Sequence, residues 1–155
     1  MVDANGQRSG ANLMFDGVSP NHELIGVNAR ALGHWIERVS PHLRRMAAGS
    51  GGRFSAQDIA DAIVQRDMQL WIILNGPEIC AAVVTSIVVY PQAKALRFMG
   101  CVGQGWRDWI HLRDEIEDWG RRQGATIAEG WVPHEKWGHM FPGYELDHMM
   151  LVKVL

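Results

Sequence analysis

The residues of this sequence that most directly suggest chemistry are three closely spaced glycines, Gly100, Gly103 and Gly105. They follow a predicted strand and precede a predicted helix that begins at Trp106. Backbone N–H groups at such a junction, with the start of a helix behind them, can bind a phosphate, and glycine lets the anion approach closely. A glycine-rich turn is also a common connection between a strand and a helix. The segment therefore predicts either an anion site or a flexible turn.

Two titratable side chains lie further along the chain. His139 falls on a short predicted helix over residues 133–141, where an imidazole is usually an ordinary surface group, although it can donate a proton near neutral pH. Glu129 falls on a predicted strand over residues 126–131, where it could be an exposed strand residue or the ion-pair partner of Arg97. The sequence leaves these alternatives open.

Other common kinds of catalytic site have little support. His134 and His139 are five residues apart, which does not place them on the same face of a helix, and neither Cys80 nor Cys101 belongs to a CxxC motif. We therefore predict no metal site. The two cysteines are expected to be small buried hydrophobic residues. The sequence also lacks the G-x-S-x-G motif of a serine hydrolase.

The elements that position these residues are predicted from hydrophobic periodicity and turn signals. Residues 20–26 lead into a helix whose apolar face begins at Val27 and continues to about Ala48, with Pro41 breaking it or opening a new turn. Ser55 and Asp58 have the spacing of a helix capping box. The remaining predicted elements are strands over 69–74, 78–90 and 95–102, a helix over 106–123, a strand over 126–131 and the short helix. Residues 144–147 and 149–155 are predicted to form two terminal strands or one bent strand.

The composition fits one globular domain without a strong electrostatic preference. The chain has 155 residues, 47% of them hydrophobic, and a formal net charge of −2. This length suits a single core, and the charge predicts no general attraction to nucleic acid or to anionic membranes. No apolar run approaches the roughly 18 residues that cross a bilayer. Residues 1–20 are predicted to form an N-terminal arm and residues 21–155 the domain.

The order of the predicted elements resembles that of the GNAT acetyltransferase superfamily. Strand, helix and strand over 95–131 form a βαβ unit, whose strands should be parallel. Residues 117–125 resemble the end of the central helix of that family, and residues 142–145 resemble its Gly-Phe turn. The resemblance covers roughly residues 21–155 and implies an α/β fold with a mixed sheet. That fold would have two N-terminal helices, an antiparallel meander, the βαβ unit, a short helix and C-terminal strands.

The resemblance also implies that acetyl-CoA is the cofactor and that the glycine-rich loop binds its pyrophosphate. The predicted cofactor-binding residues are Val102, Gly103, Gln104, Gly105 and Arg107. Two alignments with the family motif are open. In the first, residues 103–105 form its Gly-x-Gly. In the second, which is counted back from the far end of the helix, residues 107 and 109 occupy the glycine positions and the phosphate site is lost.

The catalytic residues implied by the resemblance are incomplete. Family members often use a tyrosine on the short helix as the acid, and that position is occupied by His139. The base is often a glutamate on the strand before the loop, where this chain offers only Arg97, so Glu129 on the next strand is the nearest alternative. His139 and Glu129 are therefore the predicted catalytic residues.

Within the superfamily the chain looks most like small acetyltransferase-like proteins of tailed phages, including an internal virion protein of short-tailed phages. This likeness rests on residues 69–71, on Trp109 with Leu112, and on residues 153–155. It implies a non-catalytic or weakly catalytic virion or assembly component that contacts other virion proteins, in the host cytoplasm or the virion. An active acetyl-CoA-dependent N-acetyltransferase is the alternative, and a homo-oligomer is left open. Trp106, Trp131 and Trp137 are the candidates for a protein contact.

Overall fold

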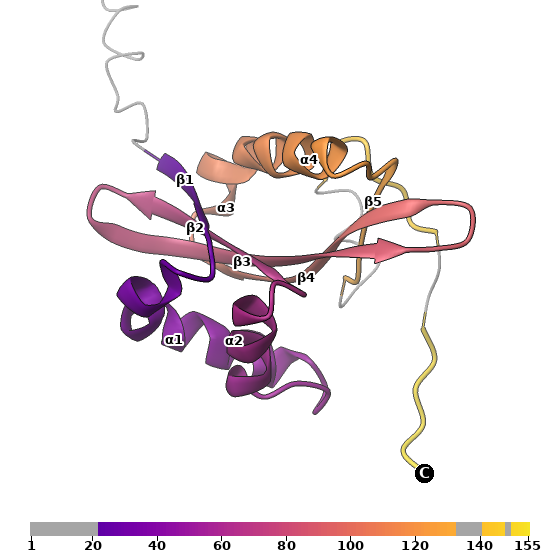
Figure 1. Cartoon of the computed structure of the whole chain (residues 1–155), viewed down its shortest axis with the longest axis horizontal. Coiled ribbons are helices and arrows are strands. Elements are labelled where there is room, and N and C mark those ends of the chain that lie inside the picture. Colours follow the sequence, from indigo (N-terminus) through magenta and orange to yellow (C-terminus); the bar gives the residue numbers. More distant parts are fainter. Residues whose placement is uncertain (1–21, 133–140, 148–149) are drawn as a thin grey trace, which may run out of the picture.

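The computed structural model describes residues 22–132, 141–147 and 150–155, and its centre is a five-stranded mixed sheet. The strands lie in sequence order, and the first four are antiparallel while β5 runs parallel to β4 (Figure 1). The predicted α/β fold with a mixed sheet is confirmed. The strands are β1 (His22–Val27), β2 (Gln69–Asn75), β3 (Glu78–Val89), β4 (Lys94–Gly103) and β5 (Ile127–Gly130).

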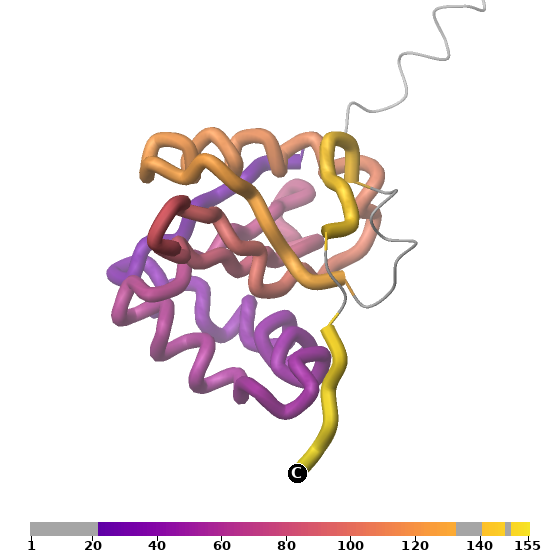
Figure 2. Tube along the Cα trace, turned by 90° about the vertical axis from the view of Figure 1, so that its right-hand side faces the viewer, coloured from indigo at the N-terminus to yellow at the C-terminus, as the bar shows by residue number. Residues whose placement is uncertain are grey.

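Helices cover both faces of this sheet and make three layers (Figures 1 and 2). One face carries α1 (Leu32–Gly49) and α2 (Ala56–Val64), and the other carries α3 (Trp106–Trp109), the short 3-10 helix η1 (Ile110–Leu112) and α4 (Arg113–Arg122). Each interface has its own hydrophobic core, because residues alternate between the two faces of a strand. Ile72 and Val84 belong to the α1–α2 side, whereas Ile73 and Leu96 belong to the α4 side.

Local signals placed several element boundaries correctly. The Ser55 side chain accepts from Asp58 N–H while the Asp58 carboxylate accepts from Ser55 N–H, so α2 begins with the predicted capping box. Gly76 has a φ of +60° in the turn between β2 and β3. Helix α1 continues through Pro41 as a single element of 18 residues, so this proline does not end the helix. No helix in the described part of the chain is long and apolar enough to cross a membrane.

The first element is a strand, and the prediction that residues 20–26 lead directly into a helix is wrong. Residues 22–27 pair antiparallel with β2, from His22↔Asn75 to Val27↔Leu70. Val27 therefore ends a strand, although its spacing suits the apolar face of a helix. The pairing partner lies more than forty residues away in the sequence. The periodicity of residues 22–27 does not contain that information.

The C-terminal segments do not form the predicted terminal strands in the part of the chain that the structure describes. Neither residues 144–147 nor residues 150–155 are in a strand. Tyr144 is held against α4 instead, where its hydroxyl donates to Glu117 Oε1 at 2.8 Å. Residues 150–155 end in solvent, away from α2 (Figure 1), and Met150 Sδ lies 3.9 Å from Arg53 Nη2. The predicted arm over residues 1–20 and most of the predicted short helix, residues 133–140, lie outside the described residues.

Candidate functional site at the diverging end of β4

The most distinctive feature of the sheet is the place where β4 continues beyond its parallel partner. Pairing between β4 and β5 runs from Ala95↔Ile127 to Phe98↔Gly130, whereas β4 extends to Gly103. The register between β3 and β4 shifts at the same level, where Val84 and Thr85 face Gly100 and Phe98 and leave Met99 as the extra residue of a bulge. In the described part of the chain, β4 therefore has no neighbouring strand on the β5 side from Met99 to Gly103. We call this stretch the open edge.

The open edge presents free backbone groups. Gln104 N–H donates to Cys80 O at 2.9 Å, which makes the neighbouring pair Gly103↔Ala81 a non-hydrogen-bonded pair. By the alternation of an antiparallel ladder, the N–H and C=O groups of Cys101 and Gly103 then point away from β3. They face the side from which β5 has diverged. An extended ligand with amide groups could lie against this edge as an added strand does.

Close packing against β3, and not a ligand, explains why position 103 is a glycine. A Cβ at this position would lie 2.3 Å from Ala81 Cβ, 2.6 Å from Ala81 Cα and 2.6 Å from Cys80 O. These distances are far below normal contact, and two of the three atoms are backbone. The close approach of β4 to β3 therefore requires glycine here, which is a role that local sequence could not reveal.

Gly105 makes the turn from β4 into α3. Its φ is +63°, a left-handed conformation that favours glycine, and its carbonyl accepts from Asp108 N–H at 2.9 Å. The N–H groups of Trp106 and Arg107 open the helix and have no partner within it. Consecutive N–H groups after a left-handed residue can form a concave anion site. Arg107 itself stacks over the Trp106 ring at 5.5 Å.

The start of α3 bears on both alignments of the glycine motif. Helix α3 begins at Trp106, directly after Gly105, so the glycines occupy the strand-to-helix junction as the first alignment requires. Trp109 is only 4% exposed, and its Nε1 donates to Gln104 O at 2.7 Å. It is part of the core and does not line the junction, as the second alignment also expects, so both alignments stay open. Whether residues 102–105 and 107 bind a cofactor stays a prediction.

One feature of the junction opposes anion binding. A Cβ built on Gly105 would lie 3.4 Å from Asp108 Oδ2, so a carboxylate stands beside the N–H groups that open the helix. Asp108 is the acidic residue of the first turn of α3, a favourable place for it with respect to the helix dipole. When an anionic ligand binds at the same place, that carboxylate becomes a repulsive neighbour.

Glu129 forms the ion pair with Arg97 that the sequence left open. Arg97 Nε lies 2.7 Å from Glu129 Oε1, and the Tyr90 hydroxyl donates to the same oxygen at 2.9 Å. Arg97 also donates to Tyr90 and stacks over the Trp131 ring at 5.1 Å. The carboxylate raises the pKa of Arg97 against the opposing effect of burial. Tyr90 is the residue of this cluster that sequence reasoning missed, because its partners lie 7 and 39 residues away.

The structure describes some of the other predicted site features. His139 lies outside the described residues. Cys101 is exposed, so the prediction that it is a buried hydrophobic residue is wrong, since it follows the bulge on the open edge. Cys80 is half-buried and its thiol donates to Ile73 O at 3.3 Å, and burial raises its pKa, so the thiol is protonated at neutral pH. Within residues 22–132, 141–147 and 150–155, no cluster of three or more His, Cys, Asp or Glu could hold a metal ion.

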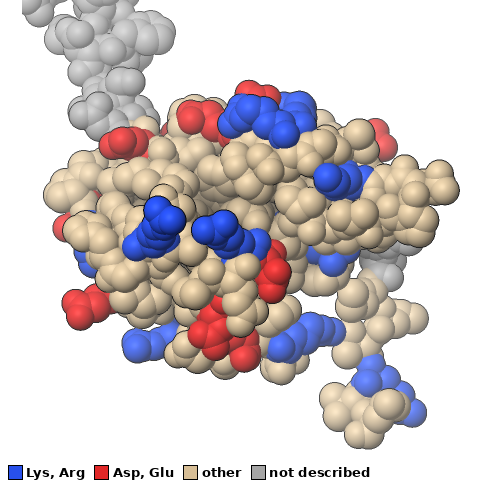
Figure 3. All heavy atoms as spheres, viewed as in Figure 1, with Lys and Arg blue, Asp and Glu red and all other residues tan. Residues whose placement is uncertain are grey.

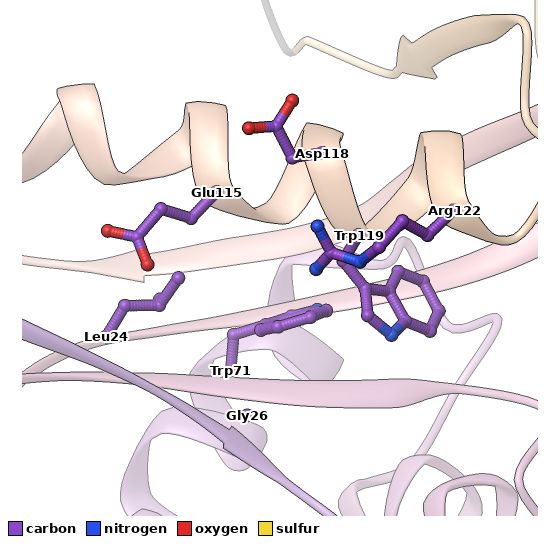
Figure 4. A pocket seen from close by; sticks show the side chains of 7 residues that line it. All are labelled: Leu24, Gly26, Trp71, Glu115, Asp118, Trp119 and Arg122. Carbon is purple, nitrogen blue, oxygen red and sulfur yellow. The ribbon is translucent and has the colours of Figure 1, made fainter.

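A separate hollow of about 280 Å³ lies between α4 and the β1–β2 side of the sheet (Figure 4). The rings of Trp71 and Trp119 meet edge to face at 5.3 Å, and Trp71 Nε1 is anchored by Thr85 Oγ1 at 2.9 Å. The rim of the hollow carries both an acidic and a basic side chain, Glu115 and Arg122, which project from α4. The strands that line this hollow are β1 and β2, whereas the open edge belongs to β4, with β3 between them. The hollow therefore does not belong to the same site.

Comparison with known proteins agrees with the overall arrangement of the helices and the sheet. An aminoglycoside acetyltransferase from an uncultured soil metagenomic sample, in complex with sisomicin, superposes with a TM-score of 0.62 and 12% identity over 86% of this chain and 96% of its own. A ribosomal-protein-alanine N-acetyltransferase from Brucella melitensis biovar Abortus 2308 gives 0.61 and 9% over 86% and 99%. The fold is that of the GNAT acetyltransferases.

A third GNAT-fold structure, described as a probable acetyltransferase, has a TM-score of 0.64 and 8% identity over 86% of this chain and 97% of its own. At such low identities the likeness establishes the fold alone. No protein-family model and no curated protein sequence matches the chain. Its function must therefore be argued from the site.

Proposed function

We propose that this GNAT-fold chain binds an acyl-CoA thioester at the open edge of β4 and is an acetyl-CoA-dependent N-acetyltransferase. The observation that carries the proposal is the combination of outward-facing N–H and C=O groups at Cys101 and Gly103 with free N–H groups at Trp106 and Arg107. An acyl-CoA has matching parts, because its pantetheine arm carries amides and its pyrophosphate is an anion. When bound, acetyl-CoA would supply an acetyl group activated as a thioester.

The residues of the chain would divide the work of binding between them. The edge of β4 would align the amide-bearing arm through backbone hydrogen bonds, as a sheet edge aligns an added strand. The junction at Gly105 would hold the pyrophosphate through the N–H groups that open α3, and Arg107 would add a positive charge. Gly103 would offer its outward-facing N–H and C=O groups to the amide-bearing arm. Val102 and Gln104 would contribute mainly by fixing the path of the chain, since Gln104 N–H is already bonded to Cys80 O.

Glu129 is the proposed base for the acceptor amine. Its carboxylate lies beside Arg97 and accepts from the Tyr90 hydroxyl, so an incoming amine would have to compete with these two donors for it. His139 remains the proposed acid.

The experiment that tests this function is a transfer assay. Free thiol released from acetyl-CoA is measured with the full chain and a panel of primary amines, with Glu129→Gln as the test variant. Amine-dependent thiol release that falls at least tenfold in Glu129→Gln supports the assignment. Release that is independent of amine, or unchanged in Glu129→Gln, contradicts the role of Glu129 as base.

The second candidate is a phage-type virion or assembly protein with weak or no catalysis, located in the host cytoplasm or the virion. It is favoured by the apolar C-terminal segment, in which Leu151, Val154 and Leu155 are more than 90% exposed. Exposed apolar side chains in a row are typical of a protein contact surface. Other virion proteins or a second copy of the chain would cover them.

This candidate is tested by fractionating purified particles and measuring the amount of the chain in them. A fixed stoichiometry, lost when residues 150–155 are deleted, supports the assembly role. Absence from particles, together with amine-dependent acetyl transfer, supports the enzyme instead.

A further inference from the structure

A second hollow lies where β1 turns into α1 and α2 turns into β2. Its volume is about 350 Å³, within the range of small-ligand sites. Its apolar surface comes from Val27, Ile63 and Met68, of which Val27 and Ile63 are 5% and 2% exposed. Arg30 and Arg66 stand in its wall. The hollow therefore combines an apolar floor with two cationic side chains.

The two guanidinium groups are not neutralised by the residues around them. No acidic side chain lines the hollow, and neither Arg30 nor Arg66 forms an ion pair or side-chain hydrogen bond within the described part of the chain. Figure 3 shows basic side chains near the middle of the face in view, with acidic side chains beside them. A guanidinium presents a planar fork of N–H donors that matches a carboxylate or a phosphate.

Arg66 occupies a backbone position that would suit glycine better. Its φ is +69°, the only positive value at a non-glycine residue in the described part of the chain. The residue follows α2 and its C-cap Gln65, with Arg66 N–H donating to Ile63 O at 3.1 Å and Asp67 N–H donating to Ala62 O at 2.9 Å. Glycine is the usual residue at this place after a helix. The arginine therefore costs the fold stability, and its side chain lines the hollow.

We propose that this hollow is a binding site for a small organic anion. Arg30 and Arg66 would bind the carboxylate or phosphate group of the ligand, and the apolar floor would contact a short aliphatic chain of the same ligand. The site is separate from the acyl-CoA site, because the end of β1 is three strands from the open edge of β4, or about 14 Å at the usual strand spacing. The proposal does not depend on acetyl transfer.

The test is a titration of the full chain with acetate, butyrate and hexanoate, followed by backbone amide NMR. Amide shifts should be confined to the β1–α1 and α2–β2 turns, and each added methylene should tighten binding about fourfold until the floor is covered. Inorganic phosphate and butyl phosphate are titrated in the same way. Whichever of the two head groups, carboxylate or phosphate, binds more tightly identifies the chemical class of the natural ligand. Shifts spread over the whole surface, or affinity that ignores chain length, would overturn the proposal.

Arg66→Gly separates binding from folding. Because glycine suits a φ of +69°, the unfolding temperature of this variant should not fall, whereas hexanoate should bind at least tenfold more weakly. Arg30→Gln should weaken binding similarly. Arg44→Gln, at an exposed position of α1 away from the hollow, is the matched control and should bind as the wild type does. Equal binding by Arg66→Gly and wild type would refute the site, and unchanged acetyl-CoA binding by Arg66→Gly would show that the two sites are separate.

Discussion

Replacing Gly103 with alanine should destabilise the sheet before it affects any ligand. The new Cβ would lie 2.3 Å from Ala81 Cβ and 2.6 Å from both Ala81 Cα and Cys80 O. No rotamer change relieves a clash with backbone atoms, so β3 and β4 must separate or the end of β4 must detach. Adding a methyl group to a packed site costs roughly 1–3 kcal/mol, and contacts this short indicate a loss of about 3 kcal/mol.

The measurement is urea unfolding followed by tryptophan fluorescence, for which the chain has seven tryptophans. In a thermal unfolding experiment, the same loss of about 3 kcal/mol would lower the melting temperature by roughly 6–12 °C in a domain of this size. Gly33→Ala in α1 is the matched control, because nothing lies within 4 Å of a Cβ built there. Alanine is the better helix former, so this control should gain up to about 1 kcal/mol.

A Gly103→Ala protein that loses less than about 0.5 kcal/mol, the range of a neutral surface change, would refute the close contact between the strands. The prediction also affects how ligand experiments are designed. Loss of CoA binding in a Gly103 variant would report on the sheet and not on the junction. Variants at Arg107 and Asp108 test the junction more cleanly.

Three further predictions follow from individual contacts. Asp108→Asn should tighten acetyl-CoA binding several-fold by calorimetry, because removing a carboxylate from the helix start is worth roughly 0.3–1 kcal/mol to an anion there; weaker binding would contradict this. Thr85→Val should cost about 1–3 kcal/mol in urea unfolding, because it leaves the buried Trp71 Nε1 without its acceptor. Burial and, to a lesser extent, Arg45 lower the pKa of His42, so the folded state resists its protonation. The stability associated with His42 should therefore be complete above about pH 6.5 and decrease as the pH falls below it, and His42→Leu should remove that part of the pH dependence.

The elements predicted well are those specified by nearby residues. Asn75 and Gly76 fix the turn between β2 and β3, and Ser55 with Asp58 fixes the start of α2. Gly124, with a φ of +86°, follows the end of α4 as expected. In each case the signal and the structure lie within four residues of each other, so the sequence contains the whole interaction.

The features missed are those that depend on distant residues. Strand β1 exists because it pairs with β2, and Tyr144 is held by Glu117 on α4 instead of continuing into a strand. The need for glycine at position 103 comes from its contact with Ala81 across the sheet. A glycine loop read from sequence alone therefore looks like a single ligand motif, although Gly103 and Gly105 are glycines for different structural reasons.

The pairing of Glu129 with Arg97 is an intermediate case. Its two strands were predicted to be parallel neighbours, and their registered pair Arg97↔Glu129 follows from that arrangement. The sequence therefore indicated the ion pair as one of the alternatives for Glu129. The side-chain geometry shows that the ion pair forms, and a role of Glu129 as a base stays a prediction, because a base and an ion-pair partner have the same residue type and the same place on a strand.

The most direct test of the central claim is calorimetric titration of the full chain with acetyl-CoA. Binding at the open edge and the α3 junction predicts a dissociation constant on the order of micromolar, near −8 kcal/mol. Binding should weaken at least fivefold in Arg107→Gln and should not change in Arg121→Gln, which alters an exposed arginine in the last turn of α4. The absence of binding at millimolar acetyl-CoA, or equal binding by all three proteins, would contradict the proposed site.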